Sequence, residues 1–299
     1  MIRLKRQLEK IDEQKNLYRI LLNRSRYRQA LEDHVWATAA DLTSRFDLSV
    51  NSKVDEEQQK SAKGLMPAFE TVRRAPKHQL DVPFIIDTHA QALAFVNTEA
   101  CGYLRTMRAR WLNSTMIVAN PVKIPYLLDQ LVEGVNQEHV PAFYWDERPD
   151  RQFQKYAKHP VMQAIETNYN LVAIHPFSDG NKRIARLMTA WVLDKYGYIP
   201  LSVYNRSAYI AGIENYFDTR RPHGLYHVML DQMRQSYDQA ICEARALDRV
   251  CVEMARRTPE KKTKSPQHNR ALLGIKGNGN LPLLHRNGGV PENRLAPTM

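Results

Sequence analysis

The sequence predicts a mainly α-helical protein: a helical bundle with one small β-hairpin, a helical N-terminal extension and a disordered C-terminal tail. Three observations predict this fold class. Apolar residues recur at spacings of three and four in several segments between residues 2 and 254. One short run, 114–119, is β-branched in the manner of a strand. After Arg257 the composition changes to prolines, Gly-Asn pairs and few large apolar residues.

The first third of the chain predicts polar helices followed by a loop. Residues 2–33 are rich in Arg, Lys and Gln and have one narrow apolar stripe, and residues 35–46 continue the helical pattern until 47–51 interrupt it. The stripe can pack on the domain, which we favour, or pair with another chain. Residues 65–83 mix Pro67, Pro76 and Pro83 with charged residues, so we expect a loop-rich connection there.

The central third predicts two helices separated by the hairpin. Residues 86–107 have apolar residues at helical spacing and predict one helix. Residues 114–119 are the expected first strand, Asn120-Pro121 the turn, and Val122-Lys123-Ile124 the returning antiparallel strand. Residues 125–136 restart a helix, and the polar and aromatic residues 137–158 predict a connecting loop.

The last part of the chain predicts four further helices. The first begins at His159-Pro160 and ends at Ile174. The second runs from Lys182 to an end near Gly197, a favoured residue type just after a helix. The other two cover residues 203–217 and 225–254. We expect the tail, 258–299, to be disordered.

The net charge of +11 is distributed unevenly over three predicted parts. The N-terminal helix, 1–35, holds nine Lys/Arg against five Asp/Glu, and the tail, 256–299, holds nine against two. The body, 36–255, therefore holds 25 of each sign and is neutral. A DNA-binding body would be expected to carry its own basic stripe. We therefore predict no nucleic-acid partner for the body.

The apolar content and the cysteines indicate a cytosolic protein. Apolar residues make up 43% of the chain, which suits a globular core. No segment approaches eighteen uninterrupted apolar residues, and the N-terminus lacks the apolar centre of a signal peptide, so we predict no membrane partner. Cys101, Cys242 and Cys251 have no metal-ligand spacing and are interpreted as buried thiols of a reducing compartment.

The candidate chemistry is concentrated in residues 175–186, HPFSDGNKRIAR. His175 can act as a general base near neutral pH, and Asp179 is an oxygen ligand suited to Mg²⁺. Gly180 lets a ligand approach the backbone at a helix start, where N–H groups favour an anion. Three cations follow it: Lys182, Arg183 and Arg186. The alternative is a capped core helix beside a buried histidine, but the whole set favours a phosphate site.

This stretch resembles the signature of Fic-domain proteins, H-x-F-x-(D/E)-G-N-G-R-x-x-R. The matching residues are His175, Phe177, Asp179, Gly180, Asn181, Arg183 and Arg186. Lys182 departs from the second Gly and is similar to the Doc branch of the family. Doc-like motifs usually carry Ala where this chain has Gly180. The resemblance extends over residues 36–255 and is strongest from 116 to 231.

The resemblance implies a Fic-type helical bundle and transfer of AMP from ATP to a hydroxyl of a target protein. His175 would be the base and Asp179 would hold Mg²⁺. The nucleotide would be bound by Gly180, Asn181, Lys182, Arg183 and Arg186, with Arg186 at the γ-phosphate. Lys182 keeps open the Doc-like alternative, in which the γ-phosphate is transferred to the target.

By the same resemblance the predicted hairpin is the flap that docks a target segment beside the active site. We expect Met116, Ile117, Val118 and Lys123 to contribute to this docking, because backbone pairing would hold the target with little demand on its sequence. A simple edge hairpin is the alternative. The position of the hairpin ahead of the motif favours the flap.

An inhibitory segment is expected upstream of the motif. Many Fic proteins carry a Ser or Thr followed four residues later by Glu, which pairs with the second motif arginine. Ser52 and Glu56 match that spacing, whereas Glu57 departs from the usual Gly or Asn. A carboxylate beside Arg186 would occupy charge meant for phosphate. The alternative is an ordinary helix start with a capping box.

The expected partner is a target protein with a Ser, Thr or Tyr hydroxyl. The sequence leaves open whether an antitoxin or a second copy of the chain also binds. The basic tail resembles those that serve some bacterial Fic effectors or toxins as type IV secretion signals, although a solubilising tail is the commoner case. The remaining alternative is a nucleotide-sensing regulator without turnover, whose basic ends bind DNA or a protein.

Overall fold

The computed structural model describes residues 2–46, 54–109, 118–138, 158–219 and 221–257. Residues 1–254 form one compact unit. Among the described residues the regular structure is helical, and the one strand-type contact is an isolated antiparallel bridge between Leu104 and Phe177. The predicted mainly α-helical fold class is confirmed.

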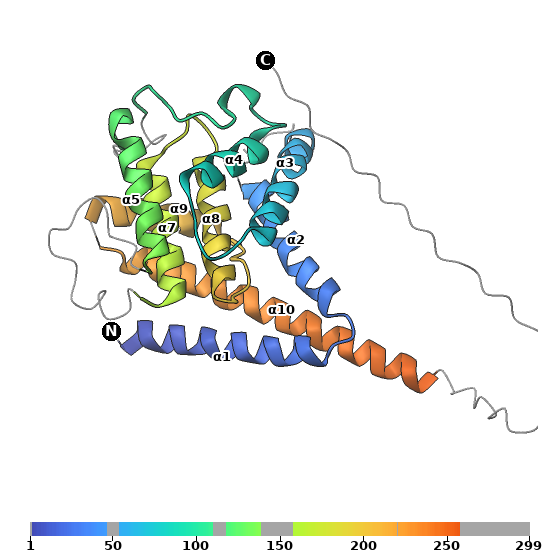
Figure 1. The fold of residues 1–299 in the computed structure, drawn as a ribbon. Helices are drawn as coiled ribbons and strands as arrows, with labels where there is room; N and C mark the ends of the chain where they lie inside the picture. The colour runs from blue at the N-terminus through green and yellow to red at the C-terminus, as the bar shows by residue number, and fades with distance from the viewer. Residues whose placement is uncertain (1, 47–53, 110–117, 139–157, 220, 258–299) are drawn as a thin grey trace, which may run out of the picture. The chain divides into compact units, whose positions relative to one another are not determined.

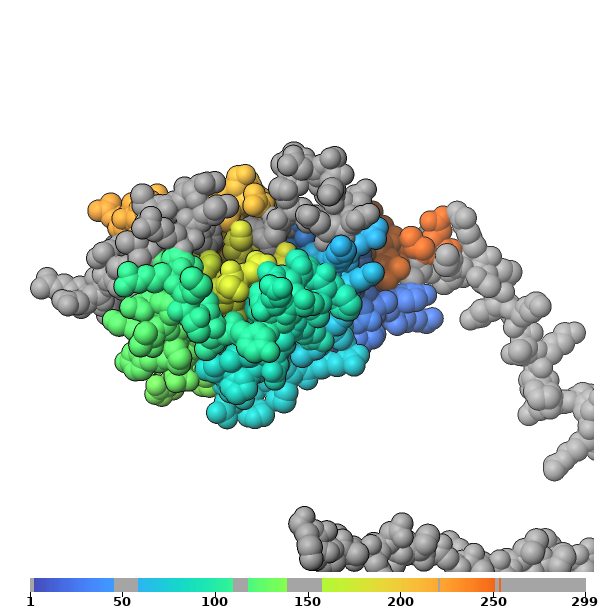
Figure 2. All heavy atoms as spheres, turned by 90° about the horizontal axis from the view of Figure 1, so that it is seen from above, coloured from blue at the N-terminus to red at the C-terminus, as the bar shows by residue number. Residues whose placement is uncertain are grey.

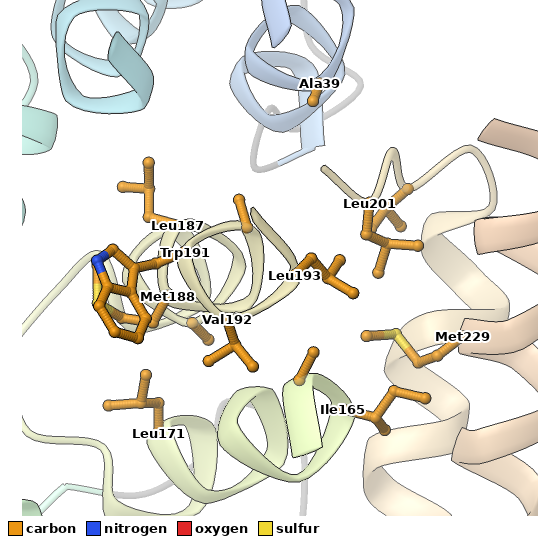
Figure 3. Packing of buried hydrophobic residues seen from close by; sticks show 14 of the residues in the cluster. Ala39, Ile165, Leu171, Leu187, Met188, Trp191, Val192, Leu193, Leu201 and Met229 are labelled. Carbon is orange, nitrogen blue, oxygen red and sulfur yellow. The ribbon is translucent and has the colours of Figure 1, made fainter. Parts of the chain in front are cut away.

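Two helices joined by a short loop form the centre of the first unit. α7 (Pro160–Ile174) is buried from Val161 to its end, and α8 (Asn181–Lys195) is buried along most of its length. Figure 3 shows α8 between Ile165 and Leu171 of α7, Ala39 of another helix and Met229 of a third. Because the two helices are covered on nearly every side, the loop between them is held by a rigid core.

In the described part of the chain, seven further α-helices surround this pair (Figure 1). They are α1 (Ile2–Arg24), α2 (Arg28–Phe46), α3 (Val54–Arg74), α4 (Val82–Leu93), α5 (Ile124–Asn136), α9 (Arg206–Thr219) and α10 (His223–Arg257). Two 3-10 turns, η1 (Thr98–Ala100) and η2 (Pro121–Lys123), follow α4 and precede α5. None of the described helices combines the length and apolar character that crossing a bilayer requires.

The N-terminal helix packs on the bundle through its apolar stripe. Leu8, Ile11 and Tyr18 of α1 are buried, whereas Ile20 is 49% exposed. The Lys15 ammonium donates to the Tyr196 carbonyl at 2.7 Å, just after α8. The predicted single helix over 2–33 is wrong at residues 25–27, where the chain turns between α1 and α2.

The helix boundaries around the motif agree with the sequence prediction. His159 precedes α7 and its ring Nδ1 accepts from the Val161 N–H at 3.3 Å, so it caps the helix start. His175 is the residue at which α7 ends. Gly197 has φ of +70° just after α8, as expected of a glycine that ends a helix.

The predicted loop over 65–83 is wrong for its first ten residues, which belong to α3. Leu65, Ala68, Phe69 and Val72 lie at helical spacing and are at most 3% exposed. Each large apolar side chain contributes about 1.5–3 kcal/mol on burial. Together they outweigh the roughly 3 kcal/mol cost of Pro67 inside the helix.

The predicted helix over 86–107 is also too long, because α4 ends at Leu93. The helix begins earlier than predicted, since the Asp81 carboxylate accepts from the Phe84 N–H at 2.7 Å and caps it. Residues 94–107 then turn, with Gly102 at φ of +71°. The Arg105 N–H donates to the Pro176 carbonyl at 2.9 Å, so this segment is used to hold the motif loop.

The predicted returning strand of the hairpin, 122–124, is wrong. Pro121–Lys123 form η2, and Ile124 begins α5. The Asn120 side chain accepts from the Val122 N–H at 3.2 Å, so Asn-Pro is a helix cap followed by a first-turn proline. The expected first strand lies mostly in 114–117, outside the described residues.

The prediction of buried thiols is wrong for two cysteines. Cys101 is partly exposed and Cys242 is exposed. Cys242 follows the buried Ile241 and lies on the outer face of α10. The side chain of Cys251 lies outside the described part of the chain.

Candidate active site

The loop between α7 and α8 begins at His175, which ends α7 in a left-handed conformation. Its φ is +51° and its ψ +58°, and its N–H donates to the Leu171 carbonyl at 3.0 Å. This conformation costs a non-glycine residue on the order of 1 kcal/mol, so the surrounding contacts must hold it. In Figure 2 the yellow atoms of this part of the chain reach the surface between α5 and the teal segment that includes α4.

The Asn181 side chain closes the loop. Its carbonyl oxygen accepts from the Phe177 N–H at 2.9 Å, and its amide donates to the Phe177 carbonyl at 2.8 Å. Phe177 is fully buried, and Asn181 is only 4% exposed. Both polar ends of the amide are therefore engaged by the loop backbone. Asn181 was expected at the phosphates, but its contacts here are those of a residue that shapes the loop.

Gly180 immediately precedes α8 and has φ of +75°, in the region that favours glycine. A Cβ at this position would lie 2.9 Å from Leu93 Cδ1 and 3.1 Å from His89 Nε2. As the N-cap residue, Gly180 has no side chain that could accept from the first N–H groups of α8. Those groups and the helix dipole therefore favour an anion at this end of the helix.

The predicted cations lie in the first turns of α8. Arg183 is 7% exposed and Arg186 is 3% exposed, whereas Lys182 is partly exposed. One Arg186 NH2 group donates to the Thr43 carbonyl in α2 at 3.4 Å. Two guanidinium groups held in the interior beside a helix N-terminus concentrate positive charge, which suits a phosphate chain.

The surroundings of His175 favour its neutral form. Burial lowers its pKa to about 4, and the positive charges of Arg105 and Lys182 act in the same direction. A hydrogen bond to the Val172 backbone and the charge of Asp179 oppose the shift. At neutral pH the imidazole is therefore uncharged and able to accept a proton, as a general base must be.

Arg105 is a site residue that the sequence analysis missed. It is 7% exposed, and its guanidinium donates to four backbone carbonyls, those of His175 at 2.5 Å, Ala119 at 2.6 Å, Met107 at 2.8 Å and Ile174 at 3.3 Å. No motif or spacing marks this arginine in the sequence, because its partners at the end of α7 are far along the chain.

His89 of α4 is the second missed residue, and it supports the other end of the loop. Its ring stacks on Phe177, with centroids 3.6 Å apart. Nδ1 accepts from the Gly102 N–H at 3.1 Å, so Nε2 carries the proton and donates to the Asp179 carbonyl at 2.9 Å. Burial lowers the pKa of His89 to about 4, which keeps this arrangement neutral.

Asp179 is the one predicted metal ligand. Its side chain is exposed, with Oδ1 accepting from the Gly180 N–H at 2.6 Å and Oδ2 from the Asn97 amide at 3.3 Å. Within the described residues no group of three or more His, Cys, Asp or Glu side chains could hold a metal. A single carboxylate still fits Mg²⁺, which commonly binds through one or two carboxylates, water and substrate phosphates.

The structure describes only part of the other predicted site residues. Met116, Ile117 and Ser52 lie outside the described residues. Val118 is buried, and Lys123 lies in η2. Glu56 belongs to the first turn of α3, but its side chain lies outside the description.

Residues 79–193, which include α4, α5, α7 and most of α8, match the family model described as the Fic/DOC family. These residues form a Fic domain. The Fic match covers the helix that carries His89, the segment that carries Arg105 and the whole motif. The family that the motif suggested is therefore confirmed.

Curated relatives align with this chain over limited lengths. The protein adenylyltransferase fic-1 of Caenorhabditis briggsae is 29% identical over 141 residues, which is 46% of this chain and 24% of that protein. The protein adenylyltransferase Fic of Culex quinquefasciatus is 46% identical over 50 residues, 17% of this chain and 10% of that protein. The aligned part spans a quarter or less of either relative.

Solved structures of Fic proteins share the fold. Residues 134–508 of Fic-1 from C. elegans align with a TM-score of 0.60 at 16% identity, covering 81% of this chain and 73% of that one. A Fic-domain-containing signalling protein of Bacteroides thetaiotaomicron aligns with a TM-score of 0.60 at 18% identity, covering 79% of this chain and 98% of that one. At these identities the likeness concerns the fold.

Proposed function

We propose that this Fic domain transfers AMP from ATP to a Ser, Thr or Tyr hydroxyl of a target protein. The observation that carries the proposal is the meeting, at one rigid loop, of a neutral His175 with the N-terminus of α8 and its two buried arginines. A base and a phosphate-binding helix start at the same loop are the parts that nucleotidyl transfer requires. The curated relatives named above as protein adenylyltransferases support the same reaction.

The proposed seat of the nucleotide is the first turn of α8. The phosphates would lie over Gly180 to Lys182, with Arg183 beside them and Arg186 at the γ-phosphate. Asn181 contributes by holding the loop in shape. Asp179 would hold a Mg²⁺ together with the phosphates, and this ion would supply charge neutralisation.

In the proposed reaction His175 takes the proton from the target hydroxyl. The hydroxyl oxygen forms a bond to the α-phosphorus, and the bond from that phosphorus to the bridging oxygen of the β-phosphate breaks. The products are an AMP–protein adduct and pyrophosphate. Since little covalent work falls to the protein, positioning and charge stabilisation supply most of the acceleration.

A second candidate reaction is transfer of the γ-phosphate, and Lys182 is the residue that favours it. Lys182 is partly exposed at the start of α8, and its charge contributes to the lowered pKa of His175. A side chain here fills space that the usual motif leaves open, which could reverse the nucleotide. Gly180 and Arg186 favour AMP transfer.

Two further parts of the proposal concern residues near or outside the described ranges, and a third concerns location. Glu56 would inhibit the enzyme by pairing with Arg186. The hydrogen bond from Arg186 to the Thr43 carbonyl in α2, the helix that precedes the expected inhibitory segment in the chain, supports this role. Met116, Ile117, Val118 and Lys123 would dock the target. We place the enzyme in the cytoplasm or, as a secreted effector, outside the cell.

Replacing His175 with Ala tests the proposal. Loss of a general base is expected to slow label transfer by about 10²–10⁴-fold, while ATP binding is retained because His175 does not hold the phosphates. The measurement is incorporation of α-labelled ATP into the protein or a target lysate, with ATP affinity measured by calorimetry. Normal labelling by a folded His175→Ala protein would show the assignment to be wrong.

A further inference from the structure

The segment 102–105, which we call the strap, runs along the motif loop and is bonded to it at several points. The Gly102 N–H donates to His89, which in turn donates to the Asp179 carbonyl. Leu104 forms the β-bridge with Phe177. The Arg105 N–H donates to the Pro176 carbonyl at 2.9 Å. The strap therefore lies against the loop from its middle to its His175 end.

We infer that Arg105 is the positioning residue for His175: its side chain fixes the end of α7 and hence the place from which the imidazole meets the target hydroxyl. The inference rests on the proposed nucleotidyl transfer. It concerns the protein groups that orient the base, none of which the motif includes.

The hydrogen bonds of Arg105 hold the C-terminal end of α7 in place. The last carbonyls of α7, on Ile174 and His175, carry the negative end of the helix dipole and lack partners within the helix. The guanidinium donates to both of them and to the Ala119 carbonyl, and the Ala119 N–H donates to the Ala173 carbonyl at 3.3 Å. The end of α7 is thereby tied to the strap and to the start of the segment before α5.

These contacts are specific to arginine. A guanidinium presents five N–H donors in a planar fork, whereas a lysine ammonium has three on one atom. Four carbonyls from three parts of the chain can therefore be bonded at once by Arg105 but not by Lys. The left-handed conformation of His175 is strained on its own and depends on such contacts.

The same guanidinium influences protonation of the base. The charged groups that act on His175 are Arg105, Lys182 and Asp179, from the strap, α8 and the loop. Burial is the largest cause of its lowered pKa, and the charge of Arg105 is the next. Removing that charge should therefore raise the pKa toward the ordinary histidine value of about 6.5.

The test compares Arg105→Gln, Arg105→Lys and Arg108→Gln with the wild type. Arg108 is an exposed arginine of the same stretch and is the matched control. Three quantities are measured on the full chain: the rate of label incorporation at saturating α-labelled ATP, the ATP concentration that gives half that rate, and the His175 pKa by NMR without nucleotide. Thermal unfolding checks that each variant is folded.

Arg105→Gln is expected to lower the rate by roughly 10–100-fold through misplacement of the base, with the half-saturating ATP concentration unchanged. Its His175 pKa should rise. Arg105→Lys should keep the pKa low, because the charge remains, but should still lower the rate. Arg108→Gln should match the wild type in all three measurements.

A folded Arg105→Gln protein with the wild-type rate and the wild-type His175 pKa would overturn the inference. So would failure of both Arg105 variants to fold, since Arg105 would then be required for the fold rather than for the base. If the wild type itself transfers no label, the proposed function fails. The His175 pKa, measured without nucleotide, then decides separately whether Arg105 acts on the base.

Discussion

Gly180 shows how a single residue limits the shape of the site. It combines a left-handed φ with close contacts to Leu93 and His89, so a methyl group there meets both backbone strain and crowding. Gly197 has nearly the same φ, but an added Cβ would come no closer than 3.9 Å to Lys15. Comparing substitutions at the two glycines therefore distinguishes the cost of backbone strain, which both share, from the cost of crowding, which only Gly180 has.

We predict that Gly180→Ala destabilises the protein by about 1–3 kcal/mol more than Gly197→Ala. The control, Gly197→Ala, includes the strain of a left-handed alanine, which is on the order of 1 kcal/mol. The additional loss in Gly180→Ala is the cost of overpacking against Leu93 and His89. Urea unfolding of both variants gives the comparison. Equal losses in the free energy of unfolding would mean that the loop shifts to make room for the methyl group and that Leu93 and His89 do not confine it.

The sequence predicted the site residues that are close together along the chain and missed those that are not. His175, Asp179 and Gly180 lie in one stretch, so their residue types and spacing indicate the chemistry. Arg105 and His89 are brought to the loop by tertiary contacts over separations of 70 and 90 residues, and no local pattern marks them. The structural role of Asn181 could be assigned only from the hydrogen bonds that its side chain makes to the Phe177 backbone.

At the scale of elements, Glu166 connects α7 to α9 and α10. It is 1% exposed and accepts hydrogen bonds from the hydroxyls of Tyr216 and Tyr226. Burial raises its pKa to about 7, although both tyrosine bonds oppose the shift. The folded protein therefore holds a proton that the unfolded chain, whose glutamates ionise near pH 4.5, releases earlier.

This raised pKa predicts a loss of stability with rising pH. The contribution of protonated Glu166 is complete below about pH 4.5 and is lost as pH rises through 7, at about 1.4 kcal/mol for each pKa unit. The Glu166→Gln variant carries an amide that does not titrate, so it lacks this pH-dependent loss. Its free energy of unfolding relative to the wild type should therefore increase by about 2–3 kcal/mol between pH 5 and pH 8. A difference that is independent of pH in urea unfolding would refute the assignment.

Elements were predictable where their ends are encoded locally. α7 begins at His159-Pro160 and α8 ends just before Gly197, and a proline in the first turn and a glycine after the last are signals visible in the sequence. α3 was missed because burial of its apolar face outweighs Pro67. The hairpin was predicted wrongly at 122–124 because Asn120-Pro121 fits a turn and a helix cap equally well from sequence.

At the scale of the whole molecule, the site is assembled from distant parts of the compact unit 1–254. α4 provides His89, the strap provides Arg105, and α7 and α8 provide the proposed base and the proposed phosphate-binding helix start. The Fic family match spans all of these parts. In the proposed function, the bundle therefore brings one base and one anion site together.

The most direct test of AMP transfer uses the purified protein, Mg²⁺ and ATP labelled at either the α- or the γ-phosphate. Self-labelling is measured, since it requires no knowledge of the target, and Glu56→Gly is compared with the wild type. We predict label from the α-position only, and more of it in the Glu56→Gly protein. Label from the γ-position only would contradict AMP transfer and assign the protein to the kinase-like reaction that Lys182 favours.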